Sequence, residues 1–405
     1  MGDNPVFSRR SLLGAAGLTA AGSAVLGPDL LRSEQRLGGP TDGWPTYKRT
    51  SARTGYAPDA SGPVDDYEVQ WERKFPDAIG EIGPSPIAVG GDAIRFVLPS
   101  DLVGLGTDGT VRWRFRPSRT GIVGSSGSLA TDTIPKLHGE RTLLTSSFLD
   151  SLYSVGPNGT ADWRVAGFGG SSVLAGNTLV GVDASETSRT LVAIDATSGV
   201  RRWDHTITSR IVPRAAVDDQ LVCLNRNRPQ VPFQLRDVET GEITLSTTLF
   251  RPERDSSWRT SIAVTESLLY LDGATLTAVS TDDGSVAWRA LTDGDSTCTH
   301  PVVDRDSVYV VEPATGDSSR VHSFDRTTGE PHWNKPVPYA ADRPMAVTDE
   351  MLYVPYRDGV VGLDPTDGTE RFRFDQDGEC AVAVAGSRLY VASANQRTLA
   401  ALEAP

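Results

Sequence analysis

The stretch Gly199-Val-Arg-Arg-Trp203 places a tryptophan four residues after a glycine, and the same spacing returns along the chain. Four more copies carry both residues: Gly109 with Trp113, Gly159 with Trp163, Gly284 with Trp288, and Gly329 with Trp333. Two further copies end in another apolar residue, Gly241 with Leu245 and Gly368 with Phe372. Self-similarity at a fixed period indicates a repeat architecture in which each unit stacks on its neighbours.

Each unit repeats the same order of short segments. A first strand follows a proline or glycine turn, as in Pro86-Ile-Ala-Val89, and a second is rich in β-branched and aromatic residues, as in Val308-Tyr-Val-Val311. A third, such as Leu191-Val-Ala-Ile-Asp195, leads through a polar turn to the strand that carries the tryptophan. Four short strands in a repeat of about 40 to 45 residues are typical of a β-propeller blade.

The number of blades follows from the residues that close each repeat. In chain order they are Trp71, Trp113, Trp163, Trp203, Leu245, Trp288, Trp333 and Phe372, with gaps of 42, 50, 40, 42, 43, 45 and 39 residues. Residues 381–402 supply three more strands without a fourth, whereas Trp71 closes a unit with no strands before it. We therefore predict an all-β, eight-bladed propeller of four-stranded antiparallel blades. The N-terminal strand around Trp71 pairs with the last three strands, which leaves no open sheet edge.

The glycine and the tryptophan of the repeat are expected to have a structural role. Glycine adopts a positive φ at the tight turn before the last strand without steric cost. Four residues later, a large flat indole can cover the neighbouring blade. The predicted docking residues are Trp71, Trp113, Trp163, Trp203, Trp288 and Trp333, with Gly109, Gly159, Gly199, Gly284 and Gly329. Leu245 and Phe372 lack the indole, so their blades are expected to pack less tightly.

The charge of the chain excludes one class of partner. The formal net charge is −13, with only four lysines, and aspartate outnumbers glutamate by 36 to 16. Such a surface is typical of proteins that work in concentrated salt, and it argues against nucleic acid, whose binders need basic stripes. Because carboxylates are so frequent, a pair of them carries no information about catalysis.

Cysteine and histidine give no sign of a metal or disulfide framework. The three cysteines, Cys223, Cys298 and Cys380, have no CxxC spacing, and Cys223 is expected in the core. The five histidines lie at positions 138, 205, 300, 322 and 332, without the spacing of a metal site, and are interpreted as isolated strand or surface residues.

The first residues resemble an export signal. Arg9 and Arg10 precede a Gly/Ala-rich apolar run that continues to about Gly27, which predicts the twin-arginine route. Cleavage after Ala24 and a retained anchor both stay open. The predicted organisation is a signal or anchor over residues 1–27, a linker over 28–40 and the propeller over 41–405, in an extracellular or cell-surface location.

One repeat carries a family resemblance. Ala193-Ile-Asp195-Ala-Thr-Ser-Gly199-Val-Arg-Arg-Trp203 resembles the A-x-D-x-x-x-G-x-x-x-W tryptophan-docking motif of PQQ-like (quinoprotein alcohol dehydrogenase-like) propellers. Phe324-Asp325-Arg-Thr-Thr-Gly329-Glu-Pro-His-Trp333 is a close second copy. The resemblance covers residues 41–405 and implies that the tryptophans dock blade to blade. The lead-in with Trp44-Pro and Gly55-Tyr56 is similar to the start of secreted haloarchaeal members.

The family contains both enzymes and scaffolds. Its quinoprotein dehydrogenases are longer and hold the quinone with a vicinal cysteine pair and a calcium site, and no Cys-Cys pair exists here. We therefore expect no PQQ or other cofactor and no chemistry of its own. The expected function is that of a BamB-like, monomeric scaffold that binds one or more unidentified proteins and meets a membrane only through a retained N-terminal segment. A PQQ-dependent or other quinoprotein-type oxidoreductase with a site in the central channel stays open, as does a ligand-sensing ectodomain.

Three further motifs are interpreted as turns. Gly104-Leu-Gly106-Thr-Asp-Gly109 fits a dinucleotide-binding pattern but has no following helix. Asp375-Gln-Asp377-Gly378 begins like a calcium loop without an acid at position twelve. Asn158-Gly159-Thr160 is a glycosylation sequon, and also a strong hairpin signal.

Overall fold

A computed structural model describes most of the chain from Gly43 onward. The described residues are 43–76, 86–117, 133–146, 151–183, 189–207, 211–225, 230–250, 261–273, 275–291, 298–313, 318–340 and 343–405. They all lie in one compact unit, residues 38–405. The predicted export signal, with Arg9 and Arg10, and the linker of residues 28–40 lie outside the described residues.

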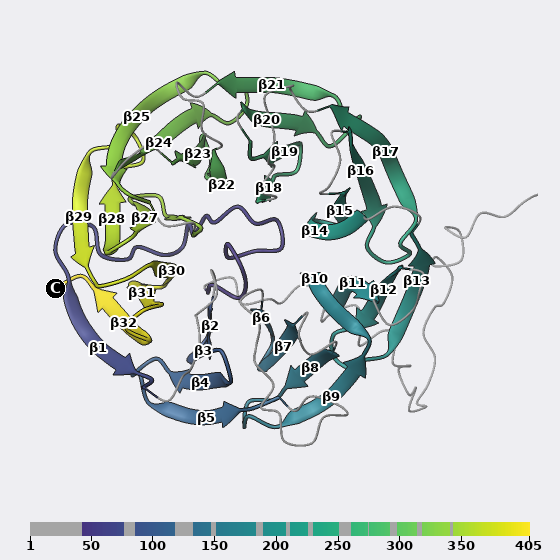
Figure 1. Ribbon diagram of the computed structural model, residues 1–405, viewed down its shortest axis with the longest axis horizontal. Helices are drawn as coiled ribbons and strands as arrows, with labels where there is room; N and C mark the ends of the chain where they lie inside the picture. Colours follow the sequence, from purple (N-terminus) through teal and green to yellow (C-terminus); the bar gives the residue numbers. More distant parts are fainter. Residues whose placement is uncertain are drawn as a thin grey trace, which may run out of the picture. The chain divides into compact units, whose positions relative to one another are not determined.

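The regular structure in the described ranges is β-sheet alone, arranged as eight four-stranded antiparallel blades in a ring (Figure 1). Blade 1 is β2 (Ile87–Gly90), β3 (Ala93–Val97), β4 (Leu102–Gly106) and β5 (Val111–Phe115). Blade 2 is β6 (Ile134–His138), β7 (Arg141–Ser146), β8 (Ser151–Val155) and β9 (Ala161–Ala166). Blade 3 is β10 (Phe168–Ala175), β11 (Thr178–Asp183), β12 (Thr190–Asp195) and β13 (Arg201–Thr206). Blade 4 is β14 (Ile211–Val217), β15 (Gln220–Asn225), β16 (Gln230–Asp237) and β17 (Ile243–Phe250).

The second half of the ring follows the same order. Blade 5 is β18 (Ile262–Val264), β19 (Leu268–Leu271), β20 (Thr275–Ser280) and β21 (Val286–Leu291). Blade 6 is β22 (Thr299–Val303), β23 (Ser307–Glu312), β24 (Ser318–Asp325) and β25 (Pro331–Pro338). Blade 7 is β26 (Ala346–Val347), β27 (Leu352–Tyr356), β28 (Gly359–Leu363) and β29 (Glu370–Asp375). Blade 8 is β30 (Cys380–Ala385), β31 (Arg388–Ser393), β32 (Thr398–Glu403) and β1 (Glu68–Lys74).

Blade 8 closes the ring with strands from both ends of the propeller. β1 pairs antiparallel with β32, and Trp71 lies opposite Ala401. The predicted all-β class, the eight blades and the closure by the strand around Trp71 are therefore confirmed.

Burial explains why three strands of each blade are apolar and the fourth is not. In blade 1 all five residues of β4 are buried, whereas the outer strand β5 alternates between exposed and half-buried residues. Inner strands are covered on both faces by adjacent blades, while the outer strand has one edge in solvent. The core is thus a series of layers between blades, and one of them joins residues of blades 7, 8 and 1.

A β-bulge precedes the closing residue in each of the eight outer strands. In blade 1, Trp113 pairs with Gly104 and Val111 with Leu105, so that Arg112 has no partner in the ladder. The other blades shift register at the same position, one residue before the tryptophan, leucine or phenylalanine. Because a bulge increases the local twist and redirects the adjacent side chain, it can aim each closing residue at the next blade.

Candidate functional site

A segment of the chain that precedes β1 lies at the centre of the ring (Figure 1). Within residues 44–61, one series of hydrogen bonds reaches the eight blades in the order of the sequence. The contacts are Trp44 with Val89, Pro45 O with Leu137 N, Ser51 Oγ with Leu174 O, Ser51 O with Ala216 N, Ala52 O with Val264 N, Thr54 O with Val303 N, Gly55 O with Val347 N, and Ser61 N with Gly386 O. We call residues 44–61 the central segment.

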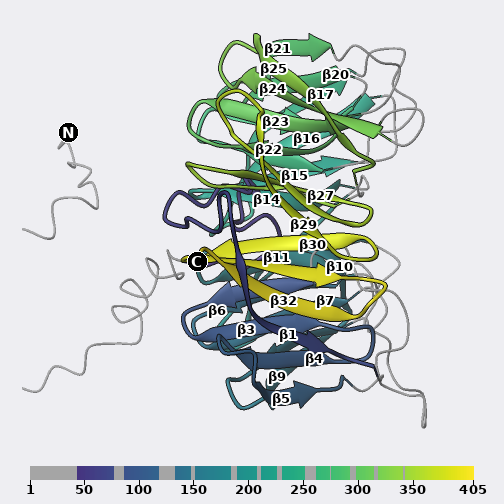
Figure 2. The ribbon, with the colours of Figure 1, turned by 90° about the vertical axis from the view of Figure 1, so that its left-hand side faces the viewer.

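The central segment lies across the C-terminal ends of the innermost strands. Its partners lie at or just after the C-terminal ends of the innermost strands, from Val89 of β2 to Gly386 after β30. Seen from the side, the segment lies toward one face of the ring (Figure 2). The hydrogen bonds satisfy backbone groups of the inner strands that the blades themselves leave unpaired.

Lys48 anchors the segment in the channel. The side chain is fully buried, and Nζ donates to Pro301 O at 2.7 Å and to Ile262 O at 3.2 Å. Burial lowers the pKa of Lys48 well below its ordinary value, and Arg53 lowers it further, while Asp272 acts in the opposite direction. A lysine with a strongly lowered pKa in a channel is a feature that functional sites share.

Several residues of the channel have an unusual backbone conformation. Lys48, Arg49 and Arg53 have φ values of 51°, 68° and 59°, and His300 on β22 has a φ of 54°. Left-handed φ angles at residues other than glycine store strain, and such residues concentrate at functional sites.

A polar cluster joins the central segment to blades 5 and 6. Ser261 Oγ lies 3.2 Å from His300 Nδ1, and the Tyr47 hydroxyl lies 3.4 Å from both atoms. The backbone N–H of Ser261 donates to the buried carboxylate of Asp272 at 3.1 Å. His300 lies in a strand, as expected, but the interpretation that it is isolated is wrong.

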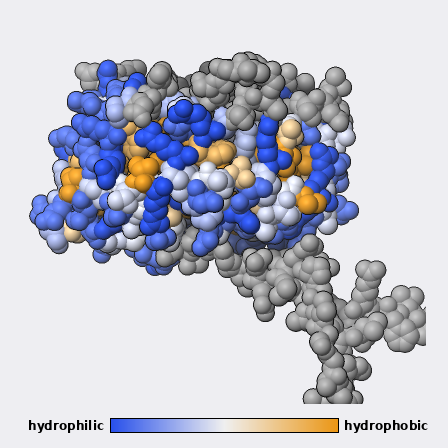
Figure 3. Space-filling view, turned by 90° about the horizontal axis from the view of Figure 1, so that it is seen from below, coloured by the Kyte–Doolittle hydropathy of each residue, from blue (hydrophilic) through white to orange (hydrophobic). Residues whose placement is uncertain are grey.

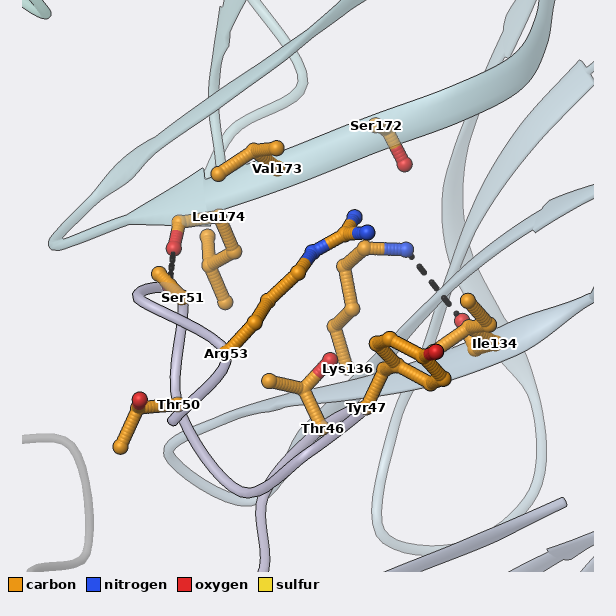
Figure 4. A pocket seen from close by; sticks show the side chains of 10 residues that line it. All are labelled: Thr46, Tyr47, Thr50, Ser51, Arg53, Ile134, Lys136, Ser172, Val173 and Leu174. Carbon is orange, nitrogen blue, oxygen red and sulfur yellow. Dashed lines mark hydrogen bonds between the residues drawn. The ribbon is translucent and has the colours of Figure 1, made fainter. Parts of the chain in front are cut away.

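A small cavity lies on the other side of Tyr47, between the central segment and blades 2 and 3 (Figure 4). Its volume is about 20 Å3, which is room for one water-sized occupant. The segment supplies half of the lining and the inner strands β6 and β10 supply the rest: Thr46, Tyr47, Thr50, Ser51, Arg53, Ile134, Lys136, Ser172, Val173 and Leu174. The channel therefore contains a basic, hydroxyl-rich space in an acidic protein.

Five of the six predicted docking tryptophans make the same hydrogen bond to the next blade. An indole N–H donates to a carbonyl oxygen in the turn before the neighbouring outer strand, at 2.8–3.2 Å. The pairs are Trp71 with Thr107, Trp163 with Thr197, Trp203 with Val238, Trp288 with Arg326, and Trp333 with Pro365.

The glycine of the next repeat lies flat against the same indole. A Cβ atom on Gly159 would lie 2.8 Å from the ring of Trp113, and one on Gly109 would lie 2.5 Å from the ring of Trp71. Gly199 and Gly329 lie against Trp163 and Trp288 in the same manner. Glycine is thus required both by its positive φ and by the contact.

The two blades that lack the indole use other contacts. A Cβ on Gly284 would meet Thr247 at 2.5 Å and Leu245 only at 3.4 Å. Phe372 is buried, and its ring lies edge-on to the ring of Tyr67 at 5.4 Å. Tyr67 directly precedes β1, so at this junction the start of the closing strand occupies the place of the docking turn.

The remaining sequence motifs lie where turns were expected. Gly106 ends β4 and Gly109 lies in the turn before β5, while Asn158 Oδ1 accepts hydrogen bonds from Thr160 in the turn before β9. The three cysteines are buried free thiols. Within the described ranges, no group of three or more His, Cys, Asp or Glu side chains is placed to hold a metal ion. The described residues include no helix of the length and apolar character needed to cross a membrane.

The fold and the docking contacts define the class of protein, an eight-bladed propeller with PQQ-like repeats. A family model described as "Outer membrane protein assembly factor BamB" matches residues 234–338 and 317–405, which confirms the resemblance of the repeats in that part of the chain. No curated protein matches the sequence at a significant level.

Solved structures of two kinds share the fold. BamB from Moraxella catarrhalis aligns with a TM-score of 0.58 and 17% identity, over 84% of this chain and 100% of that one. Quinohemoprotein alcohol dehydrogenase from Comamonas testosteroni aligns with a TM-score of 0.66 and 10% identity, over 93% and 82%. A europium-containing methanol dehydrogenase gives 0.64 and 10%, over 92% and 100%. Identities this low establish a common fold and leave the activity to be argued from the site.

The channel residues are the ones that sequence reasoning missed. Lys48 and Arg53 lie in a lead-in without strand periodicity, and their partners are far away in the sequence, as in the contact of Lys48 with Pro301. The one signal in the sequence was the rarity of lysine, which occurs only four times in this strongly acidic chain. Two of the four, Lys48 and Lys136, are buried in this channel.

Proposed function

We propose that the chain is an exported, non-catalytic propeller that acts as a protein-binding or assembly scaffold at the cell surface. The observation that carries the proposal is the central segment, which places the protein's own backbone at the centre of the ring and bonds it to all eight blades. The family match of residues 234–405 to an assembly factor supports the same function. Binding would then take place on the outer surfaces of the ring.

The space beside the central segment is too small to hold a quinone cofactor. Cofactor pockets usually enclose about 300–1,000 Å3, whereas the space beside the central segment is about 20 Å3. The cysteines are dispersed and buried in separate blades, so they form no vicinal pair. This space and the dispersed cysteines therefore give PQQ no site of the kind that the family's dehydrogenases use.

The outer strands of the blades form the outer wall of the ring, and this wall carries a repeated set of exposed apolar side chains. Large apolar side chains are exposed two or three residues before the closing position of several blades, at Val69, Val111, Val200, Ile243 and Val286. On the part of the wall seen in Figure 3, apolar side chains alternate with hydrophilic ones. Isolated apolar residues on a polar wall suit a partner that is held at several spaced points.

Two experiments test the proposal: crosslinking of the outer wall to a partner protein, and an assay for PQQ binding and quinone-dependent oxidation. A photo-crosslinking residue is placed at exposed Val200 or Ile243 and, as a control, at buried Val180. We expect both wall positions to crosslink to the same discrete envelope protein, and the buried position to give none. In parallel, the purified chain is mixed with PQQ and calcium in high salt. Stoichiometric PQQ binding with dye-linked alcohol or sugar oxidation would overturn the proposal.

The polar cluster favours a second candidate, an oxidoreductase or other enzyme with its site in the channel. Tyr47, Ser261 and His300 lie within hydrogen-bonding distance of one another beside the buried amine of Lys48. Under this candidate, His300→Gln would abolish a measured activity while leaving partner crosslinks intact. Under the scaffold proposal, the same variant leaves the crosslinks unchanged and there is no activity to lose.

A further inference from the structure

The turn between β8 and β9 in blade 2 carries the only glycosylation sequon of the chain. Of the seven asparagines in the sequence, Asn158 alone lies two residues before a serine or threonine, in Asn158-Gly159-Thr160. The side chains of Asn158 and Thr160 are both exposed. A residue that is modified on the native protein must be accessible in the folded state, and this asparagine meets that condition.

Hydrogen bonds fix the direction of the Asn158 carboxamide. Its Oδ1 accepts from the Thr160 hydroxyl at 2.7 Å and from the Thr160 backbone N–H at 3.2 Å. This is an Asx turn, in which the side-chain oxygen takes the place of a backbone acceptor. With the oxygen engaged in this way, Nδ2 makes no hydrogen bond to another described residue. The amide nitrogen, which is the atom that a glycan would occupy, is therefore available at the surface.

The equivalent turn in blade 1 shows that the repeat does not need an amide at this position. Asp108 takes the place of Asn158, and its Oδ1 accepts from the Thr110 hydroxyl at 2.6 Å and from the Thr110 N–H at 3.0 Å. The glycines that follow, Gly109 and Gly159, have φ angles of 76° and 79°. A carboxylate thus holds this turn in the same way as an amide. Asn158 adds a nitrogen that the turn itself does not use.

The sequon lies at the rim of the face that carries the central segment. The register pairs Leu137 of β6 with Thr142 of β7, and Thr142 with Val155 of β8. The turn after Val155 is therefore at the same end of the blade as Leu137, whose N–H donates to Pro45 O in the central segment. Because the Asn158 side chain is exposed there, an added sugar displaces no buried contact.

We propose that Asn158 is an N-glycosylation site, an inference that rests on the export contained in the proposed function. The donor is an oligosaccharide carried on a lipid phosphate. A bond forms between Asn158 Nδ2 and the anomeric carbon of the sugar, and the bond from that carbon to the phosphate oxygen breaks. One amide proton is released together with the lipid phosphate. The product carries a bulky, solubilising group at the rim of blade 2.

Mass spectrometry of the full chain, isolated from the envelope of the cell that produces it, tests the site. Trypsin releases the sequon in residues 142–164 and the equivalent turn of blade 1 in residues 96–112. We expect the first peptide to carry an oligosaccharide in more than half of its copies, and the second to carry none.

Variants of the turn separate the modification from the fold. Asn158→Asp should remove the glycan completely and leave the urea midpoint of the unglycosylated chain unchanged, since Asp108 holds the same turn in blade 1. Thr160→Ala should lower the glycosylated fraction at least several-fold, whereas Thr160→Ser keeps the hydroxyl and should retain the glycan. Asp108→Asn creates a second sequon in the same turn geometry, and residues 96–112 should then gain a glycan.

Failure of this inference can be distinguished from failure of the proposed function. If the exported protein has an unmodified peptide 142–164, or one changed only by deamidation of Asn158, the glycosylation site is wrong and the scaffold function stands. If the chain stays inside the cell, export is wrong. The full chain is then placed behind a twin-arginine leader in a host that N-glycosylates exported proteins. Absence of a glycan on Asn158 in that host would overturn the acceptor site as well.

Discussion

The indole N–H of Trp71 donates to the carbonyl oxygen of Thr107 at 2.8 Å. Trp71 lies in the closing strand of blade 8 and Thr107 in blade 1, so the junction between the two ends of the ring uses the same contact as the junctions inside it. Arg73 adds a hydrogen bond from Nε to Gly109 O at 2.8 Å. The closing junction is therefore as fully formed as any other.

We expect Trp71→Ala to destabilise the ring by about 2–4 kcal/mol, somewhat less than the loss for a fully buried aromatic side chain because Trp71 is half-buried. Trp71→Phe should lose less, since it keeps an aromatic ring and loses the indole N–H and part of the contact area. Urea unfolding followed by circular dichroism measures both. A loss below about 1 kcal/mol for the alanine variant would show that the indole does not secure the closure.

The loss of stability on substitution should distinguish a glycine that faces an indole from a glycine that only lies in a turn. Gly159 has a φ of 79° and would place a Cβ 2.8 Å from the ring of Trp113, whereas Gly139 has a φ of 57° with nothing within 4 Å of a Cβ. Gly139→Ala should cost about 1 kcal/mol of backbone strain. Gly159→Ala should cost at least about 1 kcal/mol more, because it also displaces the indole. Equal losses in the two variants would contradict the docking role of Gly159.

A buried pair in blade 6 gives a third prediction. His322 Nε2 and Glu312 Oε2 are 2.8 Å apart, and both side chains are less than 10% exposed. Glu312→Ala should lower the free energy of unfolding by about 2–3 kcal/mol because it leaves a buried polar group without its partner. Glu312→Gln preserves the hydrogen bond and should cost less. If the glutamine variant were as unstable as the alanine variant, charge would matter more than the hydrogen bond.

Acid should lower the stability of the propeller by protonating aspartates that accept hydrogen bonds in its turns. Backbone N–H groups of Thr328 and Thr327 donate to Asp325 and hold its pKa below the ordinary 3.8. Because this pKa is depressed in the folded state, the stabilisation is present above pH 3.8 and is lost as the pH falls through the folded-state pKa. Asp325→Asn should therefore flatten the decline of the urea midpoint below about pH 4. An unchanged pH profile would show that this turn does not contribute.

The periodic part of the fold could be predicted from the sequence. Each turn glycine and each closing residue contacts the adjacent blade, so the contacts between blades repeat with the sequence. Trp71 could be assigned to the last blade by counting strands. The bulge before each closing residue was not predicted, since the skipped residues are as different as Arg112, Asp162 and Ala287. Bulges depend on ladder geometry rather than on residue type at the skipped position.

The channel could not be predicted in the same way. Lys48 contacts residues more than 200 positions away, and the series of hydrogen bonds from the central segment to the eight blades goes to backbone atoms, which leave no side-chain signature. The segment also lacks the alternation that identifies strands. Its position is set by the eight inner strands that surround it, which come from the whole length of the propeller.

The contacts of the central segment also match the number of blades in the ring. Eighteen residues, from Trp44 to Ser61, include one series of hydrogen bonds that reaches the eight blades in order. A ring with one blade more or fewer would leave an inner strand without its contact, or a carbonyl of the segment without a donor. Propellers gain and lose blades by duplication and deletion of repeats, since each repeat contacts only its neighbours. Here a short stretch synthesised before any blade fixes the number that can close, so a change in blade number would require a matching change in the segment.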